Sequence, residues 1–128
     1  MIPNALLHIL LVFSLGIPTA SAIEDADTII EEARELRSDG ELDAAAELLD
    51  EAMETIEPDH PRFQTMHLER NYHLRMARIR QQLNDGDIEG ARATHTEVQQ
   101  FLRGHPQRSR FMDSVDRYDL VIRGRERS

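Results

Sequence analysis

The sequence predicts an all-α fold, and three observations support this prediction. Apolar residues recur at helical spacing through consecutive segments, and no segment alternates polar and apolar residues as a half-buried strand does. An eight-residue pattern occurs twice, as SDGELDAA at residues 38–45 and as NDGDIEGA at residues 84–91. A His-Pro pair also occurs twice, with its histidines at positions 60 and 105. Two markers with nearly the same period indicate a duplicated helix-turn-helix unit.

The chain begins with the order of segments that is typical of an export signal. Residues 5–17 are almost entirely apolar, and Ala20-Ser21-Ala22 follows as an A-x-A cleavage site. The apolar run is shorter than the ~20 residues that a membrane-spanning helix needs. We therefore expect a signal peptide at residues 1–22, cleaved after Ala22, and an exported protein, either periplasmic or secreted. The alternative is an uncleaved N-terminal membrane anchor formed by residues 5–17.

The rest of the chain, residues 23–128, is one domain at most and is unevenly charged. Residues 23–60 hold 15 acids against two arginines, a net charge of −13, whereas residues 61–128 hold 13 arginines against nine acids, a net charge of +4. Nucleic acid and anionic membranes repel a chain of net charge −9, so we expect neither as a partner. The acidic half is either a solvated helix face or a docking surface for a basic partner, which includes the Arg-rich half of another copy.

The first repeat is expected at residues 24–60, as two antiparallel helices. Acids crowd the start of its first helix, residues 24–38, where the helix dipole favours them. Gly40 is suited to the left-handed residue that ends this helix, and the EPDHP segment ends the second helix, residues 41–57. The expected apolar faces comprise Ile29, Ile30, Ala33 and Leu36 in the first helix and Leu42, Ala45, Ala46, Leu49, Ala52, Met53 and Ile56 in the second.

The second repeat is expected at residues 61–106, again as two helices. Pro61 can open a long helix that runs to about Asn84, because its missing N–H costs nothing at that position. Gly86 then makes the second turn, and Asp87 is a good N-cap for the next helix. The expected apolar faces comprise Leu68, Tyr72, Met76, Ile79 and Leu83 in the first of these helices and Ile88, Ala91, His95, Val98 and Leu102 in the second.

A capping helix is expected at residues 107–124, with Gly124 as its end. Phe111, Val115 and Tyr118 are in line with Ile122 and can cover the last hairpin. Solenoids usually need about three repeats to be stable, and this chain offers only about two. A homodimer, or a partner that completes the stack, is therefore an open alternative to a monomer.

At residues 24–106 the chain resembles the tetratricopeptide repeat (TPR) family. Repeats of that family have an inner-turn glycine, an aliphatic or aromatic residue two positions later, two alanines in the second helix and a proline near the end. The first repeat places Gly40, Leu42, Ala45, Ala52 and Pro58 at these positions, and the second places Gly86, Ile88 and Ala91 there but departs from the pattern at Val98. The DHP and GHP endings are similar to the longer repeats of kinesin light chains. The resemblance implies a short right-handed α-solenoid of about two TPR-like repeats plus the capping helix.

The sequence indicates neither catalysis nor a metal site. It contains no His-Glu-x-x-His motif, no nucleophile elbow and no Gly-rich phosphate loop. A Glu-x-x-His motif is absent at His67, His73 and His95, because Gln64, Arg70 and Arg92 stand three residues before them. His95 lies on an apolar face and is expected to be a hydrogen-bonded core histidine, whereas His60 and His105 precede prolines and are expected in turns. We therefore expect no enzyme, no cofactor, no metal and no small-molecule substrate.

The resemblance implies a binding site for a protein or peptide. TPR proteins hold an extended peptide on the inner faces of the first helices of their repeats. Arginine is well suited to a carboxylate or to the backbone of a bound segment. The alternative is that these arginines pair with the surplus acids of neighbouring helices. The positions carried over are Ile30, Arg34, Arg37 and Ser38 in the first repeat and His73, Met76, Arg80 and Asn84 in the second.

Two classes of function follow from this sequence. The first is a non-enzymatic, exported adaptor or scaffold that binds a protein or peptide partner. The second is a structural subunit that self-associates or completes a larger envelope complex.

Overall fold

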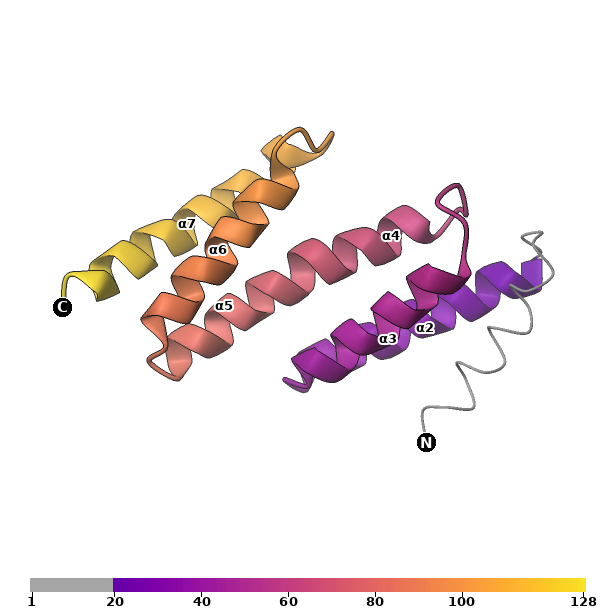
Figure 1. Ribbon diagram of the computed structural model, residues 1–128, viewed down its shortest axis with the longest axis horizontal. Helices are drawn as coiled ribbons and strands as arrows, with labels where there is room; N and C mark the ends of the chain where they lie inside the picture. Colours follow the sequence, from indigo (N-terminus) through magenta and orange to yellow (C-terminus); the bar gives the residue numbers. More distant parts are fainter. Residues whose placement is uncertain (1–19) are drawn as a thin grey trace. The chain divides into compact units, whose positions relative to one another are not determined.

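The computed structural model describes residues 20–128, which form helices joined by short turns and contain no strand (Figure 1). The predicted all-α class is therefore confirmed for this part of the chain. No helix among these residues is long and apolar enough to span a membrane. The apolar run at residues 5–17, on which the predicted signal and the alternative anchor both depend, lies outside the described residues.

The chain divides into two compact units, with Arg70 ending the first and Asn71 beginning the second. The first unit consists of α2 (Ala20–Ser38), α3 (Leu42–Thr55) and α4 (Phe63–Leu68). Helices α2 and α3 pack as a hairpin, and α4 contacts α3. Buried alanines on α2 leave room for α3 to pack against it. The core consists of Ala22, Ala26, Ile29, Ile30 and Ala33 from α2, Leu42, Ala45, Leu48, Leu49, Ala52 and Ile56 from α3 and its end, and Met66 from α4.

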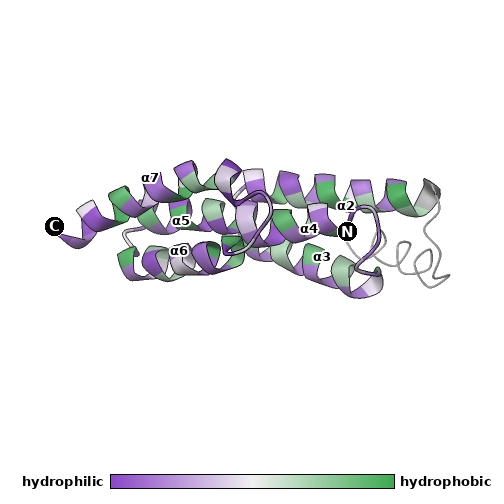
Figure 2. Ribbon diagram, turned by 90° about the horizontal axis from the view of Figure 1, so that it is seen from above, coloured by the Kyte–Doolittle hydropathy of each residue, from purple (hydrophilic) through white to green (hydrophobic). Residues whose placement is uncertain are grey.

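The second unit consists of α5 (Leu74–Asn84), α6 (Ile88–Leu102) and α7 (Arg108–Glu126). Helix α6 packs against both α5 and α7, and α5 also contacts α7. Each helix has a hydrophobic and a hydrophilic side (Figure 2). The core comprises Tyr72, Leu74, Met76, Ile79, Leu83, Ala91, Val98, Leu102, Phe111, Val115 and Ile122.

The predicted long helix is helical from Phe63 to Asn84, but its middle is a π-helical segment, η1 (Glu69–His73). A π-helical turn inserts one extra residue into the α-helical ladder and shifts the faces on either side of it. This shift explains why Leu68, predicted on the apolar face, is only half-buried, whereas Glu69 is buried. The border between the two units falls inside η1.

The two inner turns have the same geometry, as their shared sequence pattern predicts. Gly40 has a φ of 80° and Gly86 a φ of 78°, a left-handed conformation that favours glycine. Each glycine is the C′ residue of a Schellman motif, in which two backbone N–H groups satisfy the last carbonyls of the preceding helix. The paired bonds are Glu41 N–H to Leu36 O (2.8 Å) and Gly40 N–H to Arg37 O (3.1 Å) in the first turn, and Asp87 N–H to Gln82 O (2.8 Å) and Gly86 N–H to Leu83 O (3.2 Å) in the second.

The two outer turns also match each other, and both histidines lie in them as predicted. His60 Nδ1 accepts a hydrogen bond from the Arg62 N–H (3.0 Å), and His105 Nδ1 accepts one from the Gln107 N–H (3.0 Å). Arg62 and Gln107 are the N-cap residues of α4 and α7. Each imidazole therefore satisfies a donor at the start of the following helix, the task that a capping side chain normally performs.

The structure confirms one predicted helix end and corrects another. Asp87 is the expected N-cap of α6, since its carboxylate accepts a hydrogen bond from the Gly90 N–H (3.0 Å). The prediction that Gly124 ends the capping helix is wrong, because α7 continues through it to Glu126. Gly124 does not adopt the positive φ of Gly40, Gly86 and Gly104. A glycine near a helix end does not stop the helix where no left-handed turn follows.

Candidate functional site

The predicted peptide-binding residues divide between the two units. Arg34, Arg37 and Ser38 lie on the C-terminal half of α2, in the first unit. In the second unit, His73 lies at the end of η1 and the others lie on α5.

A buried carboxylate binds both arginines of the first group. Glu69 is only 1% exposed, and its Oε2 accepts a hydrogen bond from Arg37 Nε at 2.6 Å. Arg37 Nη2 approaches Oε1 at 3.5 Å, and Arg34 Nε lies 3.4 Å from the same oxygen. A carboxylate removed from water needs such partners, because an unpaired buried charge is very costly. The structure thus has the internal pairing that the sequence left as an alternative.

Sequence reasoning missed Glu69, although a signal was present. It is the only acid between Pro61 and Asn84. It stands three residues before Tyr72 and seven before Met76, both predicted on the apolar face of that helix. A lone acid beside an apolar face is buried only when it has cationic partners.

The two arginines differ in what they can offer a partner. The Arg37 side chain is 29% exposed and is held closely by Glu69. The Arg34 side chain is 46% exposed and makes the longer contact. Arg34 also borders two shallow surface depressions on α2. One is lined by Asp27, Thr28, Ile30, Glu31, Arg34, Arg62 and Thr65, and the other by Glu31, Arg34, Glu35, Ser38 and Asp39.

The lining of these depressions has mixed charge. Arg62 Nε pairs with Asp27 Oδ1 at 2.6 Å, which neutralises one acid in the first depression. Glu31 belongs to both depressions, and Glu35 and Asp39 add to the second. Arg34 is thus a half-exposed cation surrounded by exposed carboxylates. Such a surface suits a segment that carries a cationic side chain next to a carbonyl or carboxylate group.

The residues of the second group have varied surroundings. Met76 is buried and belongs to the core of its unit, so it has little surface to offer a ligand. His73 is half-buried, with its ring edge-on to Tyr72 at a centroid distance of 4.9 Å. Arg80 is exposed and donates a hydrogen bond from Nε to the Tyr118 hydroxyl (3.1 Å). Asn84 is exposed at the end of α5.

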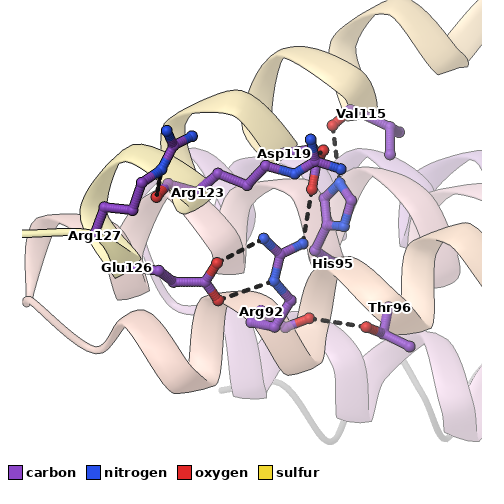
Figure 3. Close-up of polar contacts among 8 residues, drawn as sticks. All are labelled: Arg92, His95, Thr96, Val115, Asp119, Arg123, Glu126 and Arg127. Atoms are coloured by element: carbon purple, nitrogen blue, oxygen red, sulfur yellow. Dashed lines mark hydrogen bonds and ion pairs between the residues drawn. The ribbon is translucent and has the colours of Figure 1, made fainter.

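Figure 3 shows a charged cluster that joins α6 to α7. Arg92 on α6 donates from Nη2 to Glu126 Oε1 (3.0 Å) and from Nη1 to Asp119 Oδ1 (2.8 Å). Arg123 Nε lies 3.0 Å from the second Asp119 oxygen. Hydrogen bonds from Arg92 lower the pKa of both carboxyls, and these carboxylates in turn raise the pKa of Arg92. The cluster, which we call the Arg92 clasp, fastens the last helix to its neighbour.

His95 lies in the core beneath the clasp, as predicted. It is fully buried, and its Nε2 donates to the Val115 carbonyl oxygen of α7 at 2.9 Å. This hydrogen bond joins α6 to α7 inside the core. Within residues 20–128, no three His, Asp or Glu side chains are grouped so as to hold a metal ion.

No protein-family model, curated protein or solved structure matches this chain.

Proposed function

We propose that this chain is a non-enzymatic adaptor built from TPR-like helical hairpins, and that it binds a peptide segment of a protein partner. The repetition of two different turns supports this proposal. Gly40 and Gly86 close the two hairpins with the same Schellman motif, and His60 and His105 cap the helices that follow with the same hydrogen bond. A unit copied with both of its turns is typical of helical repeat proteins, whose usual role is to bind other proteins.

The proposed binding surface is the exposed side of α2 around Arg34. Arg34 is the half-exposed arginine there and borders both depressions. Arg37 instead keeps Glu69 paired inside the unit. In this proposal Arg34 contacts a carbonyl or carboxylate group of the partner, and Glu31, Glu35 and Asp39 contact its cationic side chains.

The proposal includes export of the chain. It is supported by the apolar run at residues 5–17 and the Ala20-Ser21-Ala22 site in the sequence. Intact-mass measurement of protein recovered from an envelope or secreted fraction tests this point. A mature chain that begins at Ile23, and so lacks the first three residues of α2, is the expected result. A full-length mass there indicates an anchor instead.

Affinity capture from an envelope extract, followed by titration of the captured partner, tests the adaptor function. Arg34→Gln removes the exposed cation but leaves Arg37 to hold Glu69, so folding is expected to persist. We expect it to weaken binding by a factor of about 10 to 140, because one charge-assisted hydrogen bond contributes about 1.5–3 kcal/mol.

The matched control is Arg70→Gln. It also removes one arginine of the first unit and one ion pair, the bond from Arg70 Nε to Asp50 Oδ1 at 2.9 Å, but it does not border the depressions. Its affinity is expected to equal that of the wild type. Equal losses for both variants, or none for Arg34→Gln, would contradict the proposed surface.

A further inference from the structure

The outer side of α7 carries an apolar pair. Leu120 is 66% exposed and Val121 is 46% exposed, whereas Val115 and Ile122 on the inner side are fully buried. Gly124 follows one turn later, where a Cβ would meet no atom within 4 Å. A terminal helix of a repeat protein normally presents a polar outer face, since an apolar one favours association. An exposed apolar pair on this helix therefore indicates a contact surface.

The surroundings of this pair are basic toward the C-terminus, whereas the exposed Asp116 lies one turn before Leu120. Arg117 stands one turn before it, is exposed, and forms no ion pair among residues 20–128. From Arg117 to the C-terminus the sequence has four arginines against two acids. Both acids, Asp119 and Glu126, are already bound by Arg92. We call Arg117, Leu120 and Val121 the α7 patch.

The outer side of α3 has the complementary charge. Glu47, Glu51 and Glu54 follow one another at spacings of four and three residues, which places them on one face of the helix. All three are exposed, and none forms an ion pair within the part of the chain that the structure describes. The sequence of α3 contains no basic residue that could offset them. Half-buried Ala44, three residues before Glu47, adds an apolar spot to this face, and we call the four residues the α3 strip.

We propose that the α7 patch of one copy docks on the α3 strip of a second copy of this chain. Arg117 pairs with the glutamates of the strip, and Leu120 and Val121 cover Ala44 and the aliphatic parts of the glutamate side chains. The charge of the chain favours a second copy as the occupant, since residues 23–60 carry −13 and residues 61–128 carry +4.

This contact joins two different surfaces, so it is heterologous and its repetition gives a ring or an open chain. It goes beyond the adaptor function, because neither surface includes Arg34 or the depressions beside it. Loss of the contact therefore leaves the proposed peptide site in place.

Sedimentation velocity over a wide range of protein concentrations tests the α7 patch. The mean mass of the wild type is expected to rise with concentration and to fall with added salt, which screens exposed charges. Leu120→Gln/Val121→Thr removes the apolar surface without changing the charge and is expected to weaken association about tenfold. Leu120→Met/Val121→Ile, which keeps the surface apolar, is expected to associate as the wild type does. A wild type that stays monomeric at every concentration overturns the proposal.

Charge reversal tests the α3 strip. Glu47→Lys/Glu51→Lys is expected to weaken association as strongly as the polar α7 variant does. The matched control, Glu89→Lys/Glu97→Lys, makes the same change of charge at exposed positions on α6 and is expected to retain association. Circular dichroism that matches the wild type verifies that each variant is folded.

Mixing the two weakened variants gives the decisive result. The polar α7 variant keeps an intact α3 strip, and the α3 variant keeps an intact α7 patch. We therefore expect an equimolar mixture to form a discrete heterodimer at concentrations at which neither variant associates alone. A mixture that stays monomeric overturns the proposal. An α3 variant that associates like the wild type also overturns it, because that result would mean that α7 patches contact each other.

Discussion

Glu69 is a buried carboxylate that pairs with Arg34 and Arg37 of α2. Glu69→Gln keeps the size of the side chain but removes its charge and replaces one acceptor oxygen by an NH2 donor. The two guanidinium groups are then left with a single neutral acceptor. The variant is expected to lower the free energy of unfolding by about 1–3 kcal/mol, the usual cost of disrupting a hydrogen bond between charged groups. Urea denaturation measures the change. The control Asp50→Asn breaks an exposed ion pair with Arg70 and is expected to cost less than about 1 kcal/mol. Equal costs would mean that the pairing of Glu69 contributes no more than a surface contact.

Protonation of His60, in the first outer turn, makes the stability of the fold depend on pH. Burial lowers its pKa, and the charge of Arg62 lowers it further. The unfolded chain therefore binds a proton at a higher pH than the folded chain does. The stability from neutral His60 is fully present above the unfolded pKa of about 6.5, and is lost as pH falls from there toward the folded pKa.

His60→Asn tests this link, because the Asn oxygen can still accept the Arg62 N–H bond but does not titrate. The variant is expected to lose part of the decline in unfolding free energy between about pH 7.5 and about pH 5.5. Urea midpoints at several pH values measure the slope, and the slope rather than the absolute stability decides the outcome. An unchanged slope would show that His60 titrates alike in the folded and unfolded chains.

At the scale of the elements, the effect of a glycine on stability depends on whether it lies in a left-handed turn or within a helix. Gly86 has a φ of 78°, and Gly124 lies within α7, yet a Cβ at either position would meet no atom within 4 Å. Gly86→Ala is therefore expected to cost about 1–2 kcal/mol through backbone strain alone. Gly124→Ala is expected to stabilise the chain by up to about 1 kcal/mol, because alanine favours the helix. Thermal unfolding measures both, and a destabilising Gly124→Ala would indicate that α7 ends before this residue.

The same elements show what the sequence could predict. Gly40 and Gly86, like His60 and His105, act through bonds to residues within a few positions, so a local pattern was enough to identify their turns. The pairing of Glu69 joins residues more than thirty positions apart and depends on where α4 lies against the first hairpin. The η1 segment and the exposure of Leu120 are likewise consequences of tertiary packing. The helices were therefore predictable. For Arg34 and Arg37, however, the sequence left open whether they bind a peptide or pair with acids of the same chain.

At the scale of the whole molecule, the uneven charge produces repulsion within a helix of the first unit and attraction between two helices of the second. In the first unit, α3 has five acids and no base, so like charges repel along the helix at spacings of three and four residues. In the second unit, attraction within the Arg92 clasp holds α7 to α6. Salt screens both effects at the surface. We therefore expect added salt to stabilise helix α3 and to weaken the packing of α7 against α6.

Hydrogen exchange resolved by peptide, at low and at high salt, measures this contrast. The amides of α3 are expected to gain protection as salt rises, and those of α7 to lose it, because exchange reports the local free energy of opening. The measurement belongs at a concentration low enough for the wild type to be monomeric, so that association through these helices does not contribute. Arg92→Met, which removes the clasp, is expected to abolish the salt response of α7 and to leave that of α3 unchanged. A uniform response of both helices, in either direction, would mean that general salt effects on stability outweigh the charge pattern of the two units.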